Sequence, residues 1–407
     1  MKVQLSKELQ DNPDGVVAAD IVRSCVHCGF CTATCPSYQV LGDELDSPRG
    51  RIYLIKEVLE GVQPSERTQM HLDRCLTCRA CETTCPSGVQ YGRLLDIGRR
   101  LVEEKVDRSW SSRFKRAALK RALTARVFGP TLAFGRWVRP LLPHTLRRSI
   151  PLRRGDARWA GNRSHARRML LPRGCVQPAI APEIDAATAR VLDALQIEAV
   201  RPKAACCGAL RHHLGDDALD EIRRTIDSWW PHIESGVEAI VMNASGCGAM
   251  VKEYAHLLRH DTAYASKATR VAELTRDLAE LLPEHVEQLA HQVGRHEERV
   301  VFHPPCTLQH AQKVRGAVEN VLASLGAVVL PFADSHLCCG SAGTYSILQP
   351  AVAGQLRDRK LEALQVPRPD VILSANVGCI AYLGAASEIP VRHWIEWIAV
   401  RLPAKPV

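Results

Sequence analysis

Aromatic residues are scarce in this chain of 407 residues, at 5%, and it contains no run of 18 consecutive apolar residues. So few aromatic rings argue against a large stacking platform for nucleic acid. Without a long apolar run, we expect no membrane-spanning helix. The first residues, MKVQLSKELQDNPDG, also lack the apolar core of a signal peptide, so we expect the protein to lie in the cytoplasm.

Two motifs for nucleotide cofactors are missing as well. No G-x-G-x-x-G pattern opens a helix after a strand, and no glycine-rich phosphate-binding loop occurs. The sequence therefore gives no indication that this chain binds a dinucleotide, a flavin or a nucleoside triphosphate by itself.

Cysteine, in contrast, is abundant, with 16 residues. Because thiols stay reduced in the cytoplasm, this number indicates metal binding rather than disulfides. Eight cysteines lie between residues 25 and 85, and eight are dispersed further along the chain. The dispersed set consists of Cys175, Cys206, Cys207, Cys247, Cys306, Cys338, Cys339 and Cys379.

The first eight cysteines form two copies of one motif, C-x2-C-x2-C-x3-C-P, 50 residues apart. In this spacing three thiolates wrap one [4Fe–4S] cube and the fourth ligates the other cube. A pair of zinc knuckles is the alternative, but zinc takes four ligands and would leave cysteines of each motif unused. One predicted cluster is held by Cys25, Cys28, Cys31 and Cys85, and the other by Cys75, Cys78, Cys81 and Cys35.

The 39 residues between the two motifs contain the segment Ser47-Pro-Arg-Gly-Arg51. After it, Ile52, Ile55 and Leu59 have the spacing of one helical face. We therefore expect an all-helical ferredoxin-type domain.

The dispersed cysteines belong to an internal repeat. Their intervals are 31, 1 and 40 residues in one copy and 32, 1 and 40 in the other. Short apolar runs precede the first and last cysteine of each copy, and helical patterns follow over 184–195 and 314–325. This order predicts two α/β units with cysteines on the loops after strands. Since thiolates favour iron–sulfur sites, we expect metal ligands here rather than inert buried cysteines.

The basic excess of the chain lies in one cysteine-free stretch. The net charge is +9, but residues 105–168 carry 18 Lys and Arg against two acidic residues, so the rest of the chain is net negative. Helical patterns over 110–128 and 131–142 place aromatic residues among these charges. Such helices can lie on an anionic membrane surface or dock on an acidic partner subunit. Nucleic-acid binding is disfavoured, because no recognition module accompanies the charge.

These observations predict an α+β multidomain protein. An N-terminal all-helical two-cluster ferredoxin domain is followed by a duplicated α/β cysteine-rich domain. The expected boundaries are 1–104 for the ferredoxin-type domain, 105–166 for a basic helical connector, 167–294 for the first cysteine-rich repeat and 295–407 for the second.

The paired ferredoxin motifs, the Ser47–Arg51 segment and the duplicated Cys-Cys-Gly unit together resemble the iron–sulfur subunit of bacterial glycolate oxidase. Iron–sulfur subunits of lactate-utilising systems, of anaerobic glycerol-3-phosphate dehydrogenase and of heterodisulfide reductase have a similar layout. Ala244 and Asn376 stand where the heterodisulfide reductase unit has a further cysteine. This departure disfavours a thiol–disulfide enzyme.

The resemblance implies an electron-transfer subunit of a flavin-dependent glycolate or D-lactate dehydrogenase, with no catalytic residue of its own. It implies two [4Fe–4S] clusters, and leaves open whether the repeats hold cubane, noncubane or no clusters. FAD is expected on partner glycolate oxidase subunits, which convert glycolate to glyoxylate, with membrane quinone as acceptor. The chain would then be peripheral on the inner face of the cell membrane. A glycerol-3-phosphate or lactate dehydrogenase subunit remains the alternative.

Overall fold

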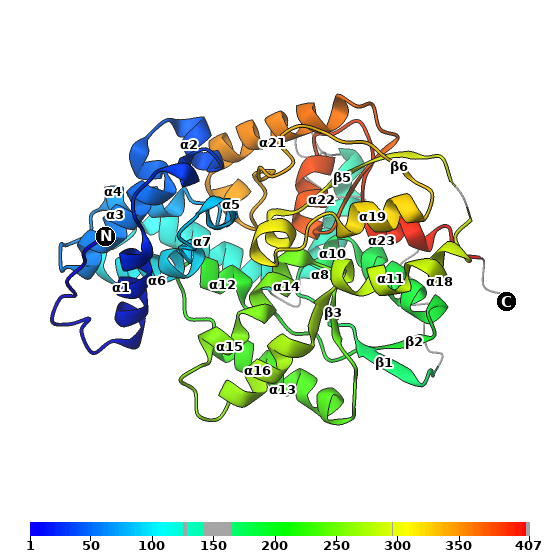
Figure 1. The fold of residues 1–407 in the computed structure, drawn as a ribbon, viewed down its shortest axis with the longest axis horizontal. Helices are drawn as coiled ribbons and strands as arrows, with labels where there is room; N and C mark the ends of the chain where they lie inside the picture. Colours follow the sequence, from blue (N-terminus) through cyan, green and yellow to red (C-terminus); the bar gives the residue numbers. More distant parts are fainter. Residues whose placement is uncertain (125–127, 142–163, 295, 404–407) are drawn as a thin grey trace. The chain divides into compact units, whose positions relative to one another are not determined.

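The computed structural model describes residues 1–124, 128–141, 164–294 and 296–403 (Figure 1). The chain divides into two compact units. The predicted domains are four consecutive ranges of the chain, whereas each of these units combines several separate segments. The predicted boundaries therefore stay a prediction. The first unit comprises Met1–Lys120, Leu210–Asp217 and His336–Lys360, and the second comprises Arg121–Ala209, Ala218–Ser335 and Leu361–Val407.

The helices of the first unit begin at strong local signals. Helix α1 (Pro13–Ser24) follows Asn12, whose side chain accepts hydrogen bonds from two backbone amides of the first turn. Helix α3 (Pro48–Leu59) begins in the same way, with Ser47 as cap and proline at the first position. A reciprocal Ser65–Thr68 cap starts α4 (Glu66–Asp73).

The core of the first unit lies where α6 (Tyr91–Lys105) packs against α1 and α3. Its centre is formed by fully buried aliphatic side chains, among them Ile55, Leu59, Leu94 and Leu95. The predicted helical ferredoxin-type architecture is confirmed. The other elements lying wholly or mainly in this unit are η1 (Phe30–Thr32), α2 (Pro36–Leu41), η2 (Glu44–Asp46), α5 (Ala80–Thr84), α7 (Trp110–Thr124), α12 (Ala209–His213), α20 (Tyr345–Leu348) and α21 (Pro350–Gln365).

The second unit contains two sheets of four parallel strands with the same topology, β2-β1-β3-β4 and β6-β5-β7-β8. This confirms the predicted duplication of an α/β unit. In each sheet the first strand of the repeat is central, so the loops that follow three neighbouring strands meet at one edge. The strands are β1 (Arg167–Leu170), β2 (Ile197–Val200), β3 (Ile240–Met242), β4 (Thr275–Asp277), β5 (Arg299–His303), β6 (Val328–Val329), β7 (Val371–Ser374) and β8 (Val391–His393).

Helices α11 (Pro182–Ala194) and α19 (Ala317–Ser324) occupy the two segments predicted as helical in the repeats. Helices α7 and α8 (Phe128–Val138) cover most of the predicted basic helices, although 125–127 and 142 lie outside the described residues. The remaining elements of the second unit are η3 (Arg139–Leu141), α10 (Gln177–Ile180), α13 (Leu219–Glu234), α14 (Ser245–Lys252), α15 (Tyr254–Leu257), α16 (Ala265–Leu274), α17 (Leu278–Leu281), η4 (Leu282–His285), α18 (Val286–Ala290), η5 (Thr307–Ala311), α22 (Val377–Gly384) and α23 (Trp394–Ala399).

The two repeats pack on each other inside the second unit. Helix α11 of the first repeat contacts α23 of the second, and α17 and η4 contact α19 in the corresponding arrangement. At the centre of this interface Ser245 Oγ and Thr307 Oγ1 are hydrogen-bonded at 2.8 Å.

Replacement of Gly50 by alanine should destabilise the first unit. A Cβ atom at this position would lie 2.1 Å from the carbonyl oxygen of Glu44 and 2.9 Å from Cα of Leu45, and neither backbone atom can move independently of the fold. We expect Gly50→Ala to lower the free energy of unfolding by roughly 2 kcal/mol or more. The measurement is the midpoint of thermal unfolding followed by circular dichroism.

Gly354, in α21, provides the matched control, because nothing lies within 4 Å of the position that its Cβ would take. Gly354→Ala should raise stability by about 0.5–1 kcal/mol through its effect on helix propensity. Equal midpoints for the two variants would contradict the close packing of Gly50.

Candidate metal centres

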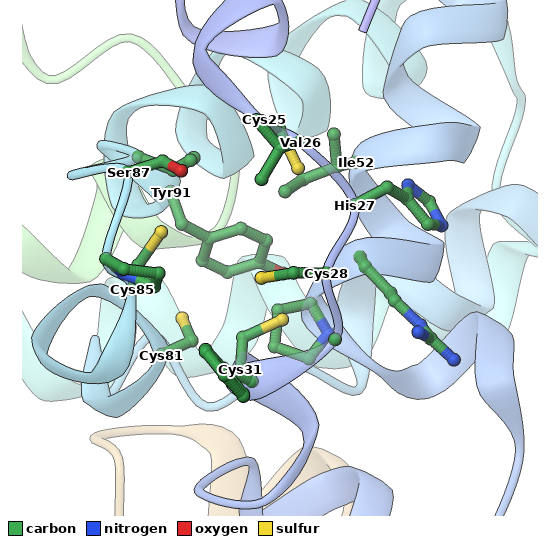
Figure 2. Close-up of a pocket in the computed structure, with 16 residues that line it drawn as sticks. Cys25, Val26, His27, Cys28, Cys31, Ile52, Cys81, Cys85, Ser87 and Tyr91 are labelled. Carbon is green, nitrogen blue, oxygen red and sulfur yellow. The ribbon is translucent and has the colours of Figure 1, made fainter.

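Thiol groups line two cavities in the first unit. The first cavity is lined by Cys25, Cys28, Cys31, Cys81 and Cys85, whose side chains surround a common space in Figure 2. The second cavity is lined by Cys35, Cys75, Cys78 and Cys81. Each cavity therefore contains the four cysteines that the sequence grouped together, including one from the other motif.

The loops that carry these cysteines have matching backbone geometry. His27 and Thr77 occupy the same place in the two motifs and have φ values of 58° and 53°. Gly29 and Arg79 also correspond, with φ values of 87° and 58°. A left-handed conformation is costly for residues other than glycine. Its repetition in both loops indicates that the cysteine spacing requires these bends.

The chemistry of the donor set fits iron–sulfur clusters. All sixteen cysteines are free thiols. Burial, with smaller contributions from Cys25 and Cys35, raises the pKa of Cys31 to about 11. Burial and the neighbouring cysteines hold the pKa of Cys81 well above its ordinary value. Thiolates in such surroundings require a nearby positive charge, which iron ions supply.

His27 belongs to the rim of the first cavity and not to its donor set. Its side chain is exposed and its Nδ1 atom lies 3.4 Å from Met1 Sδ. Figure 2 shows the ring turned away from the sulfur atoms. His27 is therefore a surface loop residue.

The four cysteines of the first repeat come together in the second unit. The thiol of Cys206 is a hydrogen-bond partner of both Cys175 and Cys207, and Cys247 partners Cys207. These contacts, together with burial, hold the pKa of Cys175 and of Cys207 well above the ordinary value. Cys175 and the Cys206-Cys207 pair lie on the segments after β1 and β2, and Cys247 lies in the first turn of α14, directly after β3. This arrangement fits a metal centre built from three segments at the common edge of the sheet.

The backbone of the adjacent pair Cys206-Cys207 is held from both sides. Thr225 Oγ1 donates to the carbonyl oxygen of Cys206 at 2.8 Å, and the Tyr254 hydroxyl donates to that of Cys207 at 2.9 Å. Gly208 follows with a φ of 84°, a conformation in which glycine has no steric penalty. These contacts hold the backbone from which both thiols project.

The cysteines of the second repeat fall in different units. Cys306 and Cys379 belong to the second unit, and Cys338 and Cys339 belong to the first. Gly340 repeats the left-handed φ of Gly208, at 84°. A ligand role for these four cysteines stays a prediction.

The two positions that lack a cysteine have different surroundings. Ala244 is buried and offers only a methyl group. Asn376 donates from Nδ2 to Cys379 Sγ at 3.5 Å. A hydrogen-bond donor to sulfur thus stands where a further ligand would be needed for a noncubane cluster.

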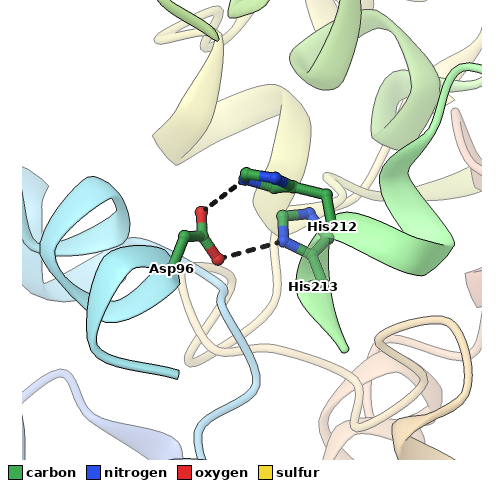
Figure 3. Close-up of side chains that lie close together, drawn as sticks. All are labelled: Asp96, His212 and His213. Atoms are coloured by element: carbon green, nitrogen blue, oxygen red, sulfur yellow. Dashed lines mark hydrogen bonds and ion pairs between the residues drawn. The ribbon is translucent and has the colours of Figure 1, made fainter. Parts of the chain in front are cut away.

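A further polar cluster joins α6 and α12 in the first unit (Figure 3). Asp96 Oδ2 lies 3.1 Å from His212 Nε2, and Asp96 Oδ1 lies 3.4 Å from His213 Nδ1. The sequence did not predict this cluster, because Asp96 is 116 residues from His212 and no local motif links the two residues. One donor atom from each residue lies within 4.8 Å of the others, as in a metal site.

The charges around Asp96 favour an ion pair over a metal ion. Although burial opposes ionisation of Asp96, His212 and His213 hold its pKa well below the ordinary value. The carboxylate in turn raises the pKa of His212 against the effects of burial and of Arg100 and Arg79. These arginines make the surroundings positive, which disfavours a further cation. We interpret the cluster as an ion pair that holds the segment 210–217 on α6.

Exposed aromatic side chains lie on α7 and α8. Trp110 and Phe114 of α7 are stacked, with ring centroids 5.6 Å apart, and are 80% and 64% exposed. Phe134 and Trp137 of α8 form a similar exposed pair. Among the described residues, none of the helices combines the length and the apolar character of a transmembrane helix.

Comparison with known proteins agrees with the two kinds of cysteine site. Residues 21–89 match the 4Fe–4S dicluster domain family, and residues 171–252 and 300–384 match the cysteine-rich domain family. The chain is therefore a 4Fe–4S dicluster protein with a duplicated cysteine-rich domain.

Similarity over the whole chain identifies the family. The glycolate oxidase iron–sulfur subunit of Escherichia coli K12 is 52% identical, over 97% of this chain and 98% of that protein. The probable glycolate oxidase iron–sulfur subunit of Bacillus subtilis 168 is 30% identical, over 88% and 87%. Lactate utilization protein A of Bacillus licheniformis is 27% identical, over 52% of this chain and 87% of that protein. The chain belongs to the family of glycolate oxidase iron–sulfur subunits.

Replacement of Asp96 by asparagine should loosen the segment 210–217 in a pH-dependent way. The pKa of His212 is raised above its ordinary value of 6.5 in the folded protein, so protonated His212 stabilises the fold fully below pH 6.5. This stabilisation is lost as the pH rises through the folded-state pKa. We expect hydrogen exchange of residues 210–217 to be about tenfold faster in Asp96→Asn at pH 6, with a smaller difference at pH 9.

Asp220→Asn is the matched control, since this aspartate is exposed and pairs only locally with Arg223. Exchange rates that differ from the parent protein equally at both pH values would show that Asp96 acts without His212.

Proposed function

We propose that this chain is the electron-relay subunit of a flavin-dependent glycolate dehydrogenase. The observation that carries this proposal is the interleaved pair of thiol-lined cavities in the first unit. When bound, each iron–sulfur cluster accepts and releases one electron at a time. The chain contributes the ligands, their burial and the charges around them.

The proposed ligands follow the grouping of the thiols. Cys25, Cys28, Cys31 and Cys85 hold one [4Fe–4S] cluster in the first cavity. Cys75, Cys78, Cys81 and Cys35 hold the other in the second cavity. Cys81 lines both cavities, so clusters held by these two sets of cysteines would be neighbours.

The cysteine-rich repeats are proposed to extend this relay. The mutual contacts of Cys175, Cys206, Cys207 and Cys247 support a further metal centre in the first repeat. By its matching spacing, the second repeat offers Cys306, Cys338, Cys339 and Cys379. Ala244 and Asn376 disfavour the heterodisulfide reductase type of chemistry, because each replaces a required thiol.

Substrate oxidation is proposed to occur on partner subunits. Removal of a hydride from a 2-hydroxy acid requires a cofactor such as FAD that accepts two electrons. The family of this chain supports FAD-binding glycolate oxidase subunits as donors, and membrane quinone as acceptor. A lactate or glycerol-3-phosphate dehydrogenase complex is the second candidate, supported by the similarity to lactate utilization protein A over about half of the chain.

The crossed ligand assignment can be tested by single cysteine variants. Cys28→Ala and Cys85→Ala lie in different motifs but should remove the same cluster, because both line the first cavity. Cys78→Ala and Cys35→Ala should remove the other. Each variant should lose about four of the irons of the two clusters, measured by iron analysis and by electron paramagnetic resonance (EPR) of the reduced protein.

Each pair of variants serves as the control for the other pair. If Cys28→Ala and Cys85→Ala abolished different EPR signals, the crossed assignment would be wrong. If none of the four changed the iron content, the eight cysteines would not be ligands.

We propose that α7 attaches the relay to an anionic membrane. The buried Arg116 anchors the inner side of the helix to Asp73 at 2.8 Å. The outer side presents Trp110, Arg113 and Phe114, and the helix contains no acidic residue. Aromatic rings flanked by arginine suit the headgroup region of an anionic bilayer.

The variant Trp110→Ala/Phe114→Ala should bind vesicles of phosphatidylglycerol and phosphatidylcholine about tenfold more weakly than the parent chain. Co-sedimentation measures this binding, with pure phosphatidylcholine vesicles as the uncharged control. Val366→Ala, which removes an exposed apolar side chain elsewhere, should have no effect. Binding only to a flavoprotein subunit, and not to anionic vesicles, would assign the surface to an acidic protein partner.

A further inference from the structure

The start of helix α3 lies between the two cavities. Pro48 lines both of them, Arg49 lines the first, and Arg51 lines the second. Gly50, between the arginines, has no space for a Cβ atom against the backbone of Glu44 and Leu45. The Ser47–Arg51 segment, which the proposed function leaves without a role, is thus held tightly with one arginine toward each cavity.

Arg51 is fully buried and its guanidinium is fixed by three partners. Nε donates to the carbonyl oxygen of His71 at 2.7 Å, Nη1 to Ser37 Oγ at 3.0 Å, and Nη2 to Asp46 Oδ1 at 3.3 Å. Ser37 Oγ lies 3.3 Å from Cys35 Sγ. Because Arg51 donates to this hydroxyl, the single hydroxyl hydrogen remains for Cys35 or for the carbonyl oxygen of Asp46.

The carboxylate of Asp46 does not cancel the positive charge beside the second cavity. It is shared between Arg51 and Arg74, the latter at 2.9 Å, and it also contacts His71. A third guanidinium, that of Arg99, donates to the carbonyl oxygen of Cys75 at 2.7 Å. The acidic residue next to Cys81 is Glu82, whose carboxylate accepts a hydrogen bond from the Gly92 amide at 2.6 Å.

A second hydroxyl group contacts one of the sulfur atoms that line the second cavity. The Tyr91 side chain is buried, and its hydroxyl donates to Cys75 Sγ at 3.7 Å. A guanidinium keeps its positive charge in a protein. Arg51 lines the second cavity together with Cys35 and Cys75.

Among the described residues that line the first cavity, none is a buried charged side chain. Arg49 is paired with Glu44 through both Nε and Nη2, at 2.5 and 3.2 Å, and its side chain is 32% exposed. Cys28 and Phe30 on this side are exposed as well. Water and the carboxylate of Glu44 screen the charge of Arg49.

We propose that Arg51, assisted by the Ser37 and Tyr91 hydroxyls, raises the reduction potential of the cluster in the second cavity above that of the cluster in the first. Reduction adds one negative charge to a cluster, and a buried cation at short range favours that state in a poorly screened environment. Hydrogen bonds to the ligand sulfurs act in the same direction. An electron that enters the domain then resides on the second cluster. The inference rests on the ligand sets proposed above.

The test is an EPR-monitored redox titration of the full-length chain, prepared anaerobically with its clusters. The Cys28→Ala and Cys78→Ala variants first assign each signal to its cavity. Arg51→Met should then lower the ratio of reduced to oxidised second cluster at fixed potential by about tenfold or more, a shift of about 59 mV per factor of ten. Arg51→Lys keeps the positive charge and should therefore keep most of the ratio of reduced to oxidised cluster that the parent chain has.

If Arg51→Met does not retain iron, two less disruptive variants can test the proposal instead. Tyr91→Phe and Ser37→Ala each remove one hydroxyl and should shift the second cluster in the same direction by a smaller factor. Tyr53→Phe is the matched control, because Tyr53 lies on α3 with an exposed side chain and lines neither cavity. It should leave both potentials unchanged.

The outcomes separate this inference from the proposed function. Full iron content with unchanged potentials in Arg51→Met and Tyr91→Phe would overturn the role of Arg51. Full iron content with a shift only in the signal that Cys28→Ala removes would overturn the ligand assignment instead. A chain that holds no reducible iron at all would overturn the proposed electron relay.

Discussion

Each thiol-lined cavity of the first unit takes its fourth cysteine from the other sequence motif, and this exchange constrains the whole unit. Cys85 must reach the loop of Cys25–Cys31, while Cys35 must reach the loop of Cys75–Cys81. Both loops must therefore be held at a fixed separation, which the packing of α1, α3 and α6 around Ile55 and Leu94 provides. Because burial opposes ionisation of the thiols, metal binding and the stability of this unit are coupled.

The cysteine-rich repeats also bring distant cysteines together, but they use a parallel sheet instead of helices. Parallel strands of matching order bring the loops after β1, β2 and β3 to one edge, so cysteines 31 and 40 residues apart become neighbours. The two copies are nevertheless unequal in their surroundings. Cys206 and Cys207 belong to the second unit, whereas Cys338 and Cys339 belong to the first. Ala244 and Asn376 add to this inequality, since only Asn376 can donate a hydrogen bond to a neighbouring thiol.

The sequence predicted those features that depend on spacing along the chain. Cysteine intervals predicted both cavities and the duplication, and apolar runs predicted the central strands β1, β3, β5 and β7. Strands β2, β4 and β8 were not predicted, because charged residues such as Glu198, Arg276 and Arg392 interrupt their apolar runs, and β6 has only two residues. Side-chain contacts between residues that are distant in the sequence could not be predicted either. Asp96 with His212, and Arg51 with Ser37, depend on helix packing that no local signal encodes.

The burial of Arg51 links the stability of the first unit to its proposed redox function. A fully buried guanidinium is costly unless opposite charge surrounds it, and Asp46 is shared with Arg74. In the proposed relay, the thiolate ligands and their cluster would carry the negative charge that completes this balance. By reciprocity, a charge that stabilises the reduced cluster is itself stabilised by reduction. The proposed effect of Arg51 on the second cluster therefore also works in reverse, because the negative charge added by reduction would offset more of the cost of burying this guanidinium.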